Sequence, residues 1–324
     1  MKELSKGASP LVRRIGEEAA EQRVDNYLIR TLKGVPKSHV YRILRSGEVR
    51  VNSRRVGPDY RLKEGDRVRV PPTRLARPAP APVEMGSEDF GGQVLYEDDA
   101  VLALDKPAGR AVHGGSGISL GLVEALRRSR PQARFLELVH RLDRDTSGVL
   151  LFAKKRSALT RLHEQLRAGT VRKLYVALVH GKWRDRKRNV RLPLQKYVLA
   201  SGERRVAVRA EGAPSHTVFT LLQALPSYSL LEAELKTGRT HQIRVHLAHL
   251  GFPVAGDVKY GDYELNRQLA ESGLKRMFLH ARAVTLIHPQ SGEPLALEAP
   301  LPSELARFLQ ACRGRTALGA GDTD

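Results

Sequence analysis

Cysteine is almost absent from this 324-residue sequence, which contains only Cys312. One thiol cannot form an intramolecular disulfide, and it cannot supply the several cysteine ligands of a structural zinc site. Long apolar runs are also missing, and Met1-Lys2-Glu3 begins no signal-peptide pattern. We therefore expect a protein of the cytoplasm that has no membrane-spanning segment.

Acidic residues are scarce relative to basic ones. The chain has 35 Asp+Glu against 55 Lys+Arg, a formal net charge of +20 at pH 7. This excess predicts a polyanionic partner, although charge alone does not distinguish RNA from DNA or from an anionic membrane. A composition that is 41% hydrophobic and 28% charged is that of a globular protein, and the length is sufficient for two domains.

Motifs for nucleotide and metal binding are missing as well. Residues 105–109 (DKPAG) and 112–117 (VHGGSG) are glycine-rich, but neither contains GK[ST] or a GxGxxG that opens a helix. We expect this loop to pass close to a large substrate instead. His246 and His249 are three residues apart without a third ligand at a familiar spacing, and HEQL at His163 is not HExxH, so no metal site is expected.

Basic residues are concentrated in the first quarter of the chain. Residues 1–77 contain 19 Lys+Arg and 9 Asp+Glu, a net charge of +10, and the other 247 residues contribute the same net charge. The charge density is thus about three times higher in this quarter than in the remainder. An exposed, solvated basic face is one interpretation, and a nucleic-acid interface is the other.

The same quarter contains the pattern of a small α+β unit. Helical spacing and breaks at glycine predict helices over residues 23–32 and 38–47. Alternation of apolar and basic residues predicts strands over 49–52 and 66–70. This order resembles the S4 RNA-binding module, and it implies phosphate contacts that weaken steeply with salt. The arginines expected to face RNA are Arg42, Arg45 and Arg50.

Composition divides the chain into five segments. Residues 73–92 are rich in proline, alanine and glycine and predict a semi-extended linker. The expected order is an N-terminal extension (1–20), the S4 module (21–72), the linker, a larger domain (93–312) and a small, polar, disordered tail (313–324).

The most informative stretch is HRLDRDTSGVLLFAKK, residues 140–155. Asp143 and Asp145 lie among arginines and are followed by the apolar run 149–153, which predicts a buried strand. Carboxylates beside an apolar wall lose hydration and need cationic partners to stay ionised. A loop with two exposed ion pairs would also give this pattern.

Two later segments supply further polar candidates. Residues 173–179 (KLYVALV) are apolar on both faces, which predicts a central strand that carries Tyr175. Residues 217–236 predict a hairpin, and Thr240 is placed to cap a helix that ends at Gly251. Arg244 lies near the start of this helix beside a Gly-Arg turn, where its guanidinium could point into a cleft. The ordinary alternatives are a core tyrosine and a surface arginine.

Taken together, the motifs resemble those of one enzyme family. DKPAG with VHGG, HRLDRDTSGVLLFAKK, KLYVALV, TGRTHQIRVHLAHLG and GDVKYG occur in the order found in the pseudouridine synthases with an HRLDxxTSG signature. The resemblance extends from about Arg23 to Arg307. It implies an α+β fold in which an N-terminal S4 domain precedes a catalytic domain with a mixed, mainly antiparallel sheet.

The resemblance also implies the roles of particular residues. Asp143 corresponds to the family's catalytic aspartate, Tyr175 to its active-site tyrosine and Arg244 to the arginine that pairs with the aspartate. Asp145 is outside the invariant pattern, and we interpret it as structural. No cofactor, energy source or metal is implied.

The implied reaction is the isomerisation of uridine to pseudouridine. A carboxylate could attack C1' of the ribose or C6 of the base, and an arginine would keep it ionised. The tyrosine would stack on the base and help to remove the C5 proton. The uridine must first be flipped out of its RNA, and Arg141 would fill the vacated position in the stack. His113, in the glycine-rich loop, is a further RNA-binding candidate.

The S4 region is most similar to that of synthases acting on 23S ribosomal RNA. The expected partner is therefore 23S rRNA or a large-subunit assembly intermediate, and the expected state is a monomer. Two alternatives remain open. The same chemistry could act on transfer RNA or on another 23S rRNA helix, or the chain could be a catalytically silent RNA-binding assembly factor.

Overall fold

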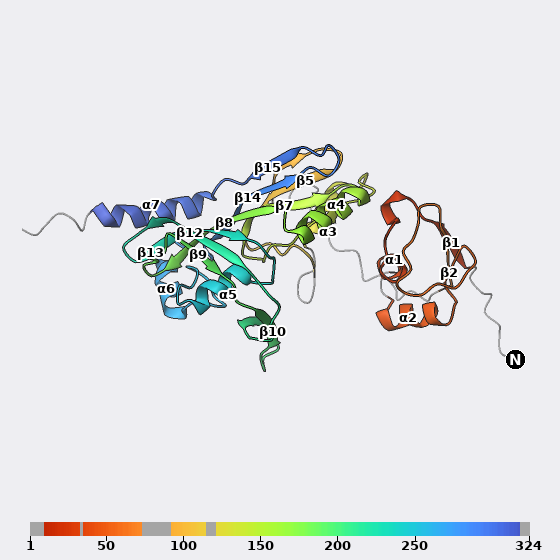
Figure 1. Ribbon diagram of the computed structural model, residues 1–324, viewed down its shortest axis with the longest axis horizontal. Coiled ribbons are helices and arrows are strands. Elements are labelled where there is room, and N and C mark those ends of the chain that lie inside the picture. Colours follow the sequence, from red (N-terminus) through yellow and green to blue (C-terminus); the bar gives the residue numbers. More distant parts are fainter. Residues whose placement is uncertain (1–9, 33–34, 73–91, 115–120, 318–324) are drawn as a thin grey trace, which may run out of the picture. The chain divides into compact units, whose positions relative to one another are not determined.

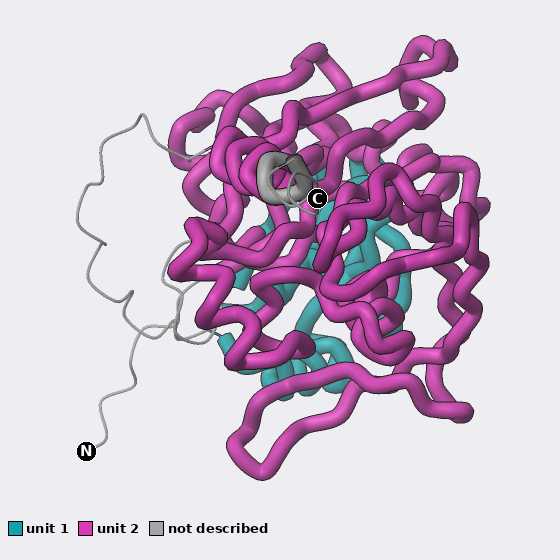
Figure 2. The backbone as a smooth tube through the Cα atoms, turned by 90° about the vertical axis from the view of Figure 1, so that its left-hand side faces the viewer, with its two compact units in different colours: residues 1–86 teal, residues 87–324 magenta. Residues whose placement is uncertain are grey.

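A computed structural model describes residues 10–32, 35–72, 92–114 and 121–317. The chain forms two compact units, residues 1–86 and 87–324, which Figure 2 colours separately. Most of the expected linker lies outside the described residues, as do residues 115–117 of the glycine-rich loop. No helix among the described residues is long and apolar enough to cross a bilayer.

The first unit has the two helices and the small sheet that the sequence predicts. The apolar residues of both helices share one core, in which Leu28 and Ile43 are fully buried. The sheet is antiparallel in the order β1-β3-β2. Its elements are β1 (Leu11–Arg14), a 3₁₀ turn (Glu17–Ala19), α1 (Val24–Thr31), α2 (Lys37–Arg45), β2 (Arg50–Val51) and β3 (Arg67–Val70).

Strand β1 corrects the expected start of this unit. Residues 1–20 were assigned to an extension, but Leu11 pairs with Val70 and Arg14 with Arg67. All four residues of β1 are exposed, so the strand has no alternation of buried and exposed positions. Backbone hydrogen bonds to β3 hold it at the edge of the sheet, and side-chain patterning does not reveal such a strand.

The second unit is built on a ten-stranded sheet in the order β4-β5-β7-β14-β8-β13-β12-β9, with β15 paired to β14 and β6 to β7. Among the described strands, β14 and β7 form the parallel pair and the other pairs are antiparallel. The expected mixed, mainly antiparallel sheet is thus confirmed. The strands are β4 (Gln93–Glu97), β5 (Val101–Lys106), β6 (Glu137–Leu138), β7 (Ser147–Ala153), β8 (Arg172–His180), β9 (Lys187–Val190), β12 (Thr217–Ala224), β13 (Tyr228–Leu235), β14 (Leu279–Ile287) and β15 (Pro294–Glu298).

Strand β7 is an interior strand of this sheet, between β5 and β14, and both of its faces are covered. All seven of its residues are buried. Leu150 and Phe152 belong to the core on one face, and Val149 and Leu151 belong to the core on the other. A strand covered on both faces must be apolar at successive positions, which is the pattern in the sequence.

The remaining elements surround this sheet. Strands β10 (Leu194–Val198) and β11 (Arg204–Val208) form a separate hairpin, and the part that contains β10 extends away from the large sheet (Figure 1). The helices are α3 (Leu122–Ser129), α4 (Arg156–Ala168), α5 (Gln242–His249), α6 (Tyr263–Glu271) and α7 (Ser303–Ala317).

Helix α7 begins before the expected tail and continues into it. Residues 313–317 are helical, and residues 318–324 lie outside the described part of the chain. Leu305, Phe308 and Cys312 of α7 pack in one core cluster, so burial stabilises the preceding turns. Because each further helical residue costs little once a helix has formed, α7 propagates beyond Cys312, its last residue in this core cluster.

Candidate active site

The loop between β6 and β7 carries Asp143, and Lys106 stabilises this loop through hydrogen bonds to its backbone. This lysine is fully buried, and its Nζ donates hydrogen bonds to the carbonyl oxygens of Pro107, Arg144 and Thr146 at 2.8, 2.9 and 2.8 Å. Burial lowers the pKa of Lys106 to about 7. The DKPAG motif by itself does not reveal that its lysine stabilises the Asp143 loop, because this contact depends on the pairing of β5 with β7.

Gly148 at the start of β7 allows this loop to approach β14 closely. Its φ is +110°, and a Cβ atom there would lie 2.1 Å from the carbonyl oxygen of Ala281. A side chain would therefore collide with backbone atoms, and only glycine adopts this conformation without strain. The glycine of the TSG motif thus allows β7 and β14 to pair closely at a point near Asp143 in the sequence.

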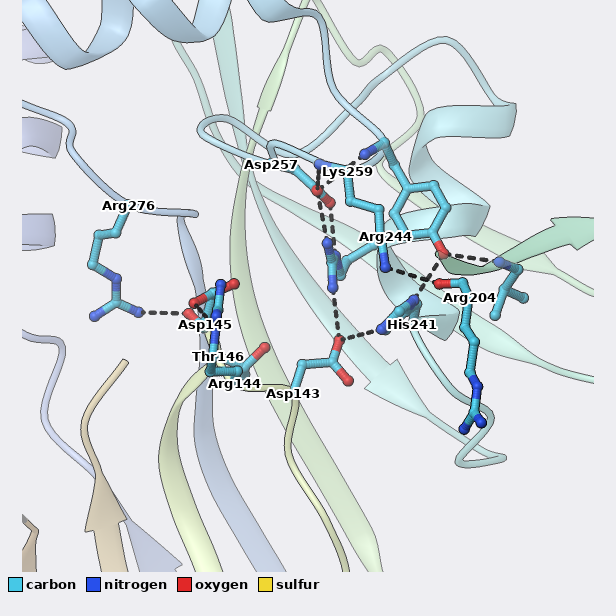
Figure 3. A network of polar contacts seen from close by, with 12 residues as sticks. Asp143, Arg144, Asp145, Thr146, Arg204, His241, Arg244, Asp257, Lys259 and Arg276 are labelled. Carbon is cyan, nitrogen blue, oxygen red and sulfur yellow. Dashed lines mark hydrogen bonds and ion pairs between the residues drawn. The ribbon is translucent and has the colours of Figure 1, made fainter. Parts of the chain in front are cut away.

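Arg244 reaches Asp143 from helix α5. Its Nη1 donates to Asp143 Oδ2 at 3.0 Å, although the two residues are 101 positions apart in the sequence (Figure 3). Helix α5 begins at Gln242, and its N-cap is His241 in the left-handed conformation, with φ 54°. Thr240 was expected to cap this helix. That expectation is wrong, because the turn continues one residue further before the helix starts.

Asp257 holds the other side of the guanidinium. Arg244 Nε donates to Asp257 Oδ2 at 2.7 Å, and Nη2 donates to Oδ1 at 2.8 Å. Asp257 Oδ1 also accepts the backbone N–H groups of Lys259 and Tyr260. Both carboxylate oxygens are thereby engaged, so the guanidinium plane has one orientation, with Nη1 directed at Asp143. Sequence reasoning quoted GDVKYG but did not assign a function to its aspartate.

Burial and charge have opposite effects on the pKa values of Asp257 and Arg244. Burial alone would raise the pKa of Asp257, but the hydrogen bonds and charge of Arg244 hold that pKa below its usual range. Burial would lower the pKa of Arg244, whereas Asp257 and Asp143 raise it overall. Arg244 is therefore a permanent cation with two carboxylate partners, and it is only 6% exposed.

Tyr175 of β8 shares a hollow of about 410 Å³ with Asp143 and Arg244. The tyrosine is 7% exposed, and burial together with the charge of Asp143 raises its pKa. Ile243 and Leu279 supply apolar walls. The three residues predicted to form the site are thus brought together, and Tyr175 stays protonated at neutral pH.

The other predicted residues lie in different places. Arg141 is exposed and lines the same hollow. His113 is exposed but is not among the residues that line it. Asp145 pairs with Arg144 at 3.2 Å and lines a second hollow of about 840 Å³, which contains neither Asp143 nor Tyr175. The RNA-binding candidates of the first unit, Arg42, Arg45 and Arg50, are all exposed.

His246, one of the two histidines considered as metal ligands, has both ring nitrogens engaged. Nε2 lies 2.9 Å from the hydroxyl of Ser215, and Nδ1 lies 3.0 Å from that of Thr217. The residue is fully buried. It therefore anchors α5 to strand β12, which helps to fix the position of Arg244 on the same helix.

Comparisons with known proteins identify both units. The RNA pseudouridylate synthase family matches residues 100–249, and the S4 domain matches residues 22–68. The ribosomal large subunit pseudouridine synthases C of Pasteurella multocida and Escherichia coli are both 53% identical to this chain. They align over 302 and 304 residues, which are 92% of this chain and 93% and 95% of theirs. The solved structure of human RNA pseudouridylate synthase domain containing 4 is 27% identical. It has a TM-score of 0.56 and covers 68% of this chain and 92% of its own.

Proposed function

The chain belongs to the RNA pseudouridylate synthase family, and we propose that it converts specific uridines of 23S ribosomal RNA to pseudouridine. The observation that carries this proposal is the convergence of Asp143, Tyr175 and Arg244 on one hollow. The names of the large-subunit relatives support the choice of RNA. We further propose that the protein acts as a monomer in the cytoplasm.

Asp143 is proposed as the nucleophile. Attack of its carboxylate on C1' would expel uracil through N1, whereas attack on C6 would form an adduct with the base. In the first route, rotation of the base and formation of the C5–C1' bond displace the carboxylate from C1'. In the second route, the N1–C1' bond of the adduct breaks, the base rotates and the C5–C1' bond forms, after which the carboxylate leaves C6. The C5 proton is lost and N1 gains a proton, so the product is an isomer of the substrate. Arg244 presents a fixed positive charge and an N–H donor to Asp143 Oδ2, because its guanidinium has no neutral form near pH 7.

Tyr175 is proposed to stack on the base and to assist the loss of the C5 proton. Because its pKa is raised, the phenolate is too rare at neutral pH to serve as a free base. Its hydroxyl could instead accept a proton while it passes its own to another acceptor. The apolar walls of the hollow would exclude water, which otherwise could capture the sugar after the bond is broken.

Removal of the Tyr175 hydroxyl separates these two roles. In Tyr175→Phe the ring remains to stack on uracil, so we expect RNA affinity to change by less than about twofold while turnover falls by roughly 100-fold. Tyr175→Leu should reduce both. Single-turnover release of tritium from [5-³H]uridine-labelled rRNA measures the step directly, and unchanged turnover in Tyr175→Phe would refute a role for the hydroxyl.

Arg141 is proposed to occupy the stack that the flipped uridine leaves. Flipping costs a few kcal/mol, and a guanidinium inserted between neighbouring bases would offset part of that cost. We expect Arg141→Ala to fold normally and to bind rRNA at least about tenfold more weakly. Fluorescence of a 2-aminopurine placed beside the target uridine reports the flip, and wild-type turnover by the variant would contradict the proposal.

The exposed arginines of the first unit are proposed to bind phosphates. Replacing Arg42, Arg45 and Arg50 together by alanine should weaken rRNA binding and reduce the slope of log affinity against log salt by about two to three. The matched variant with three lysines keeps the charge and should retain the wild-type slope. An unchanged slope in the alanine variant would indicate a solvated face.

The decisive experiment maps pseudouridines in cellular RNA. Cells lacking the gene should lose specific pseudouridines of 23S rRNA, and the wild-type gene should restore them whereas Asp143→Asn should not. Restoration by Asp143→Asn would favour a catalytically silent assembly factor. Losses confined to transfer RNA would assign the same chemistry to a different substrate.

A further inference from the structure

His241 is a second polar neighbour of Asp143, from the turn that precedes α5. Its Nε2 lies 3.9 Å from Asp143 Oδ2 (Figure 3). Its Nδ1 lies 2.7 Å from the hydroxyl of Tyr260. The side chain is 17% exposed and lines the hollow that contains Asp143. Its left-handed backbone, with φ 54°, is uncommon for a residue other than glycine and is costly unless surrounding contacts maintain it.

The hydrogen bonds of Tyr260 determine which nitrogen of His241 carries the proton. The Tyr260 hydroxyl oxygen accepts the backbone N–H of Val206 in β11 at 3.0 Å. Burial raises the pKa of Tyr260 to about 12, so the hydroxyl keeps its proton. This proton can be donated to His241 Nδ1, which places the imidazole proton on Nε2. The opposite tautomer would turn the Nε2 lone pair towards the Asp143 carboxylate, which is repulsive.

Burial favours the neutral form of His241, and the charged groups around it act in both directions. Burial lowers the pKa of His241; Asp143 raises it, Arg244 and Lys259 lower it, and Asp257 raises it. A neutral imidazole with its proton on Nε2 directs an N–H dipole towards Asp143 Oδ2, 3.9 Å away, without forming a full ion pair with it. The nucleophile therefore keeps more of its charge for the substrate than it would beside an imidazolium.

We propose that His241 and Tyr260 are positioning residues for Asp143. Tyr260 sets the imidazole tautomer so that Nε2–H faces Oδ2, the oxygen that Arg244 Nη1 also contacts. Both polar neighbours thus converge on one carboxylate oxygen. Among the described residues, no side chain or backbone group donates a hydrogen bond to Oδ1. Oδ1 is consequently the oxygen that attacks the nucleotide, an assignment that rests on the proposed function.

Contacts to the β10–β11 hairpin hold Tyr260 in place. Its neighbour Lys259 donates to the carbonyl oxygen of Arg204 at 2.8 Å and pairs with Glu203 at 3.0 Å. The ring of Tyr260 also lies under the Arg244 guanidinium, with 5.1 Å from Cζ to the ring centroid. Phenylalanine at position 260 would keep this ring contact and lose only the hydroxyl, so Tyr260→Phe tests the hydroxyl alone.

A double-mutant cycle tests whether Tyr260 acts through His241. We expect Tyr260→Phe to lower kcat by about tenfold with KM changed by less than about twofold. His241→Gln places an amide N–H near Oδ2 that has no tautomer to set, so it should keep at least about a third of wild-type kcat. In this background Tyr260→Phe should have no further effect, whereas an undiminished tenfold loss would overturn the proposal. Tyr263→Phe, which removes the hydroxyl of a residue that is 84% exposed, should behave as wild type.

The tautomer itself can be observed by NMR. In enzyme labelled with ¹⁵N-histidine, the ring resonances missing from His241→Gln belong to His241. At pH 7.5 they should report a proton on Nε2, and Tyr260→Phe should shift them towards a mixture of tautomers. A proton on Nδ1, or a protonated imidazolium, would overturn the proposal. The spectrum needs no substrate. Failure to modify 23S rRNA would therefore contradict the proposed function, whereas the tautomer of His241 could still be determined.

Discussion

Pseudouridine formation should fall by roughly four orders of magnitude when Asp143 is replaced by asparagine, which is the scale expected for loss of a nucleophile. An amide neither attacks a sugar or base carbon at a useful rate nor departs as a stable anion. Folding should be affected little, because Arg244 keeps both hydrogen bonds to Asp257. Tritium release from labelled 23S rRNA measures the turnover, and urea denaturation measures the free energy of unfolding.

Asp145→Asn provides the matched control for this experiment. Asp145 is two residues away, is partly exposed, and faces the hollow that does not contain Tyr175. The turnover of Asp145→Asn should remain within about threefold of wild type, because the loss of its partly exposed ion pair with Arg144 has little effect. Equal losses in the two variants would mean that charge in the loop, rather than the carboxylate of Asp143, sustains the reaction.

Replacement of Arg244 by leucine should damage both stability and activity. The change leaves Asp257, which is only 1% exposed, without a cationic partner, and breaking such a buried pair costs about 3 to 5 kcal/mol. Turnover should also fall at least about 100-fold, because Asp143 loses the group that stabilises its charge. Arg267→Leu is the control, since Arg267 and Glu264 form an exposed pair whose loss should cost less than about 1 kcal/mol.

The pH dependence of stability identifies the responsible carboxylate. Arg244 lowers the pKa of Asp257 in the folded state, so their interaction adds stability above the unfolded pKa and loses it as pH falls through the folded pKa. The destabilisation by Arg244→Leu should therefore be larger at pH 7 than near pH 4, where an unpaired Asp257 can be protonated. The double variant Arg244→Leu, Asp257→Leu should regain stability at pH 7 but not activity. A pH-independent loss would point to packing rather than charge.

Local patterns predicted the elements whose burial is continuous or periodic. Residues 149–153 lie within β7, residues 173–179 lie within β8, and the predicted hairpin corresponds to β12 and β13. Period-two and 3.6-residue patterns arise because each side chain faces a core or solvent, and they are readable within a few residues. Strand β1 was missed because its four side chains are all exposed and its partner β3 lies more than fifty residues away.

Some residues of the site could be predicted from local motifs, whereas others could not because their roles depend on tertiary contacts. Asp143, Tyr175 and Arg244 were named from motifs whose resemblance to a family is specific. Asp257 and His241 lay inside quoted motifs, yet their roles depend on contacts between segments distant in the chain. Asp257 acts on a side chain 13 positions earlier, and His241 depends on a hydroxyl 19 positions later.

The amino-acid sequence by itself determined the net positive charge of the chain, the impossibility of an internal disulfide, the main strands and helices, and the family. Only the tertiary structure decided that Arg244 has two carboxylate partners, and that Arg244 and His241 both face the same oxygen of Asp143. The physical reason is one of range. Propensity and periodicity act over a few neighbouring residues, whereas the convergence of charged side chains depends on how strands such as β7 and β14, more than a hundred residues apart, pair in one sheet.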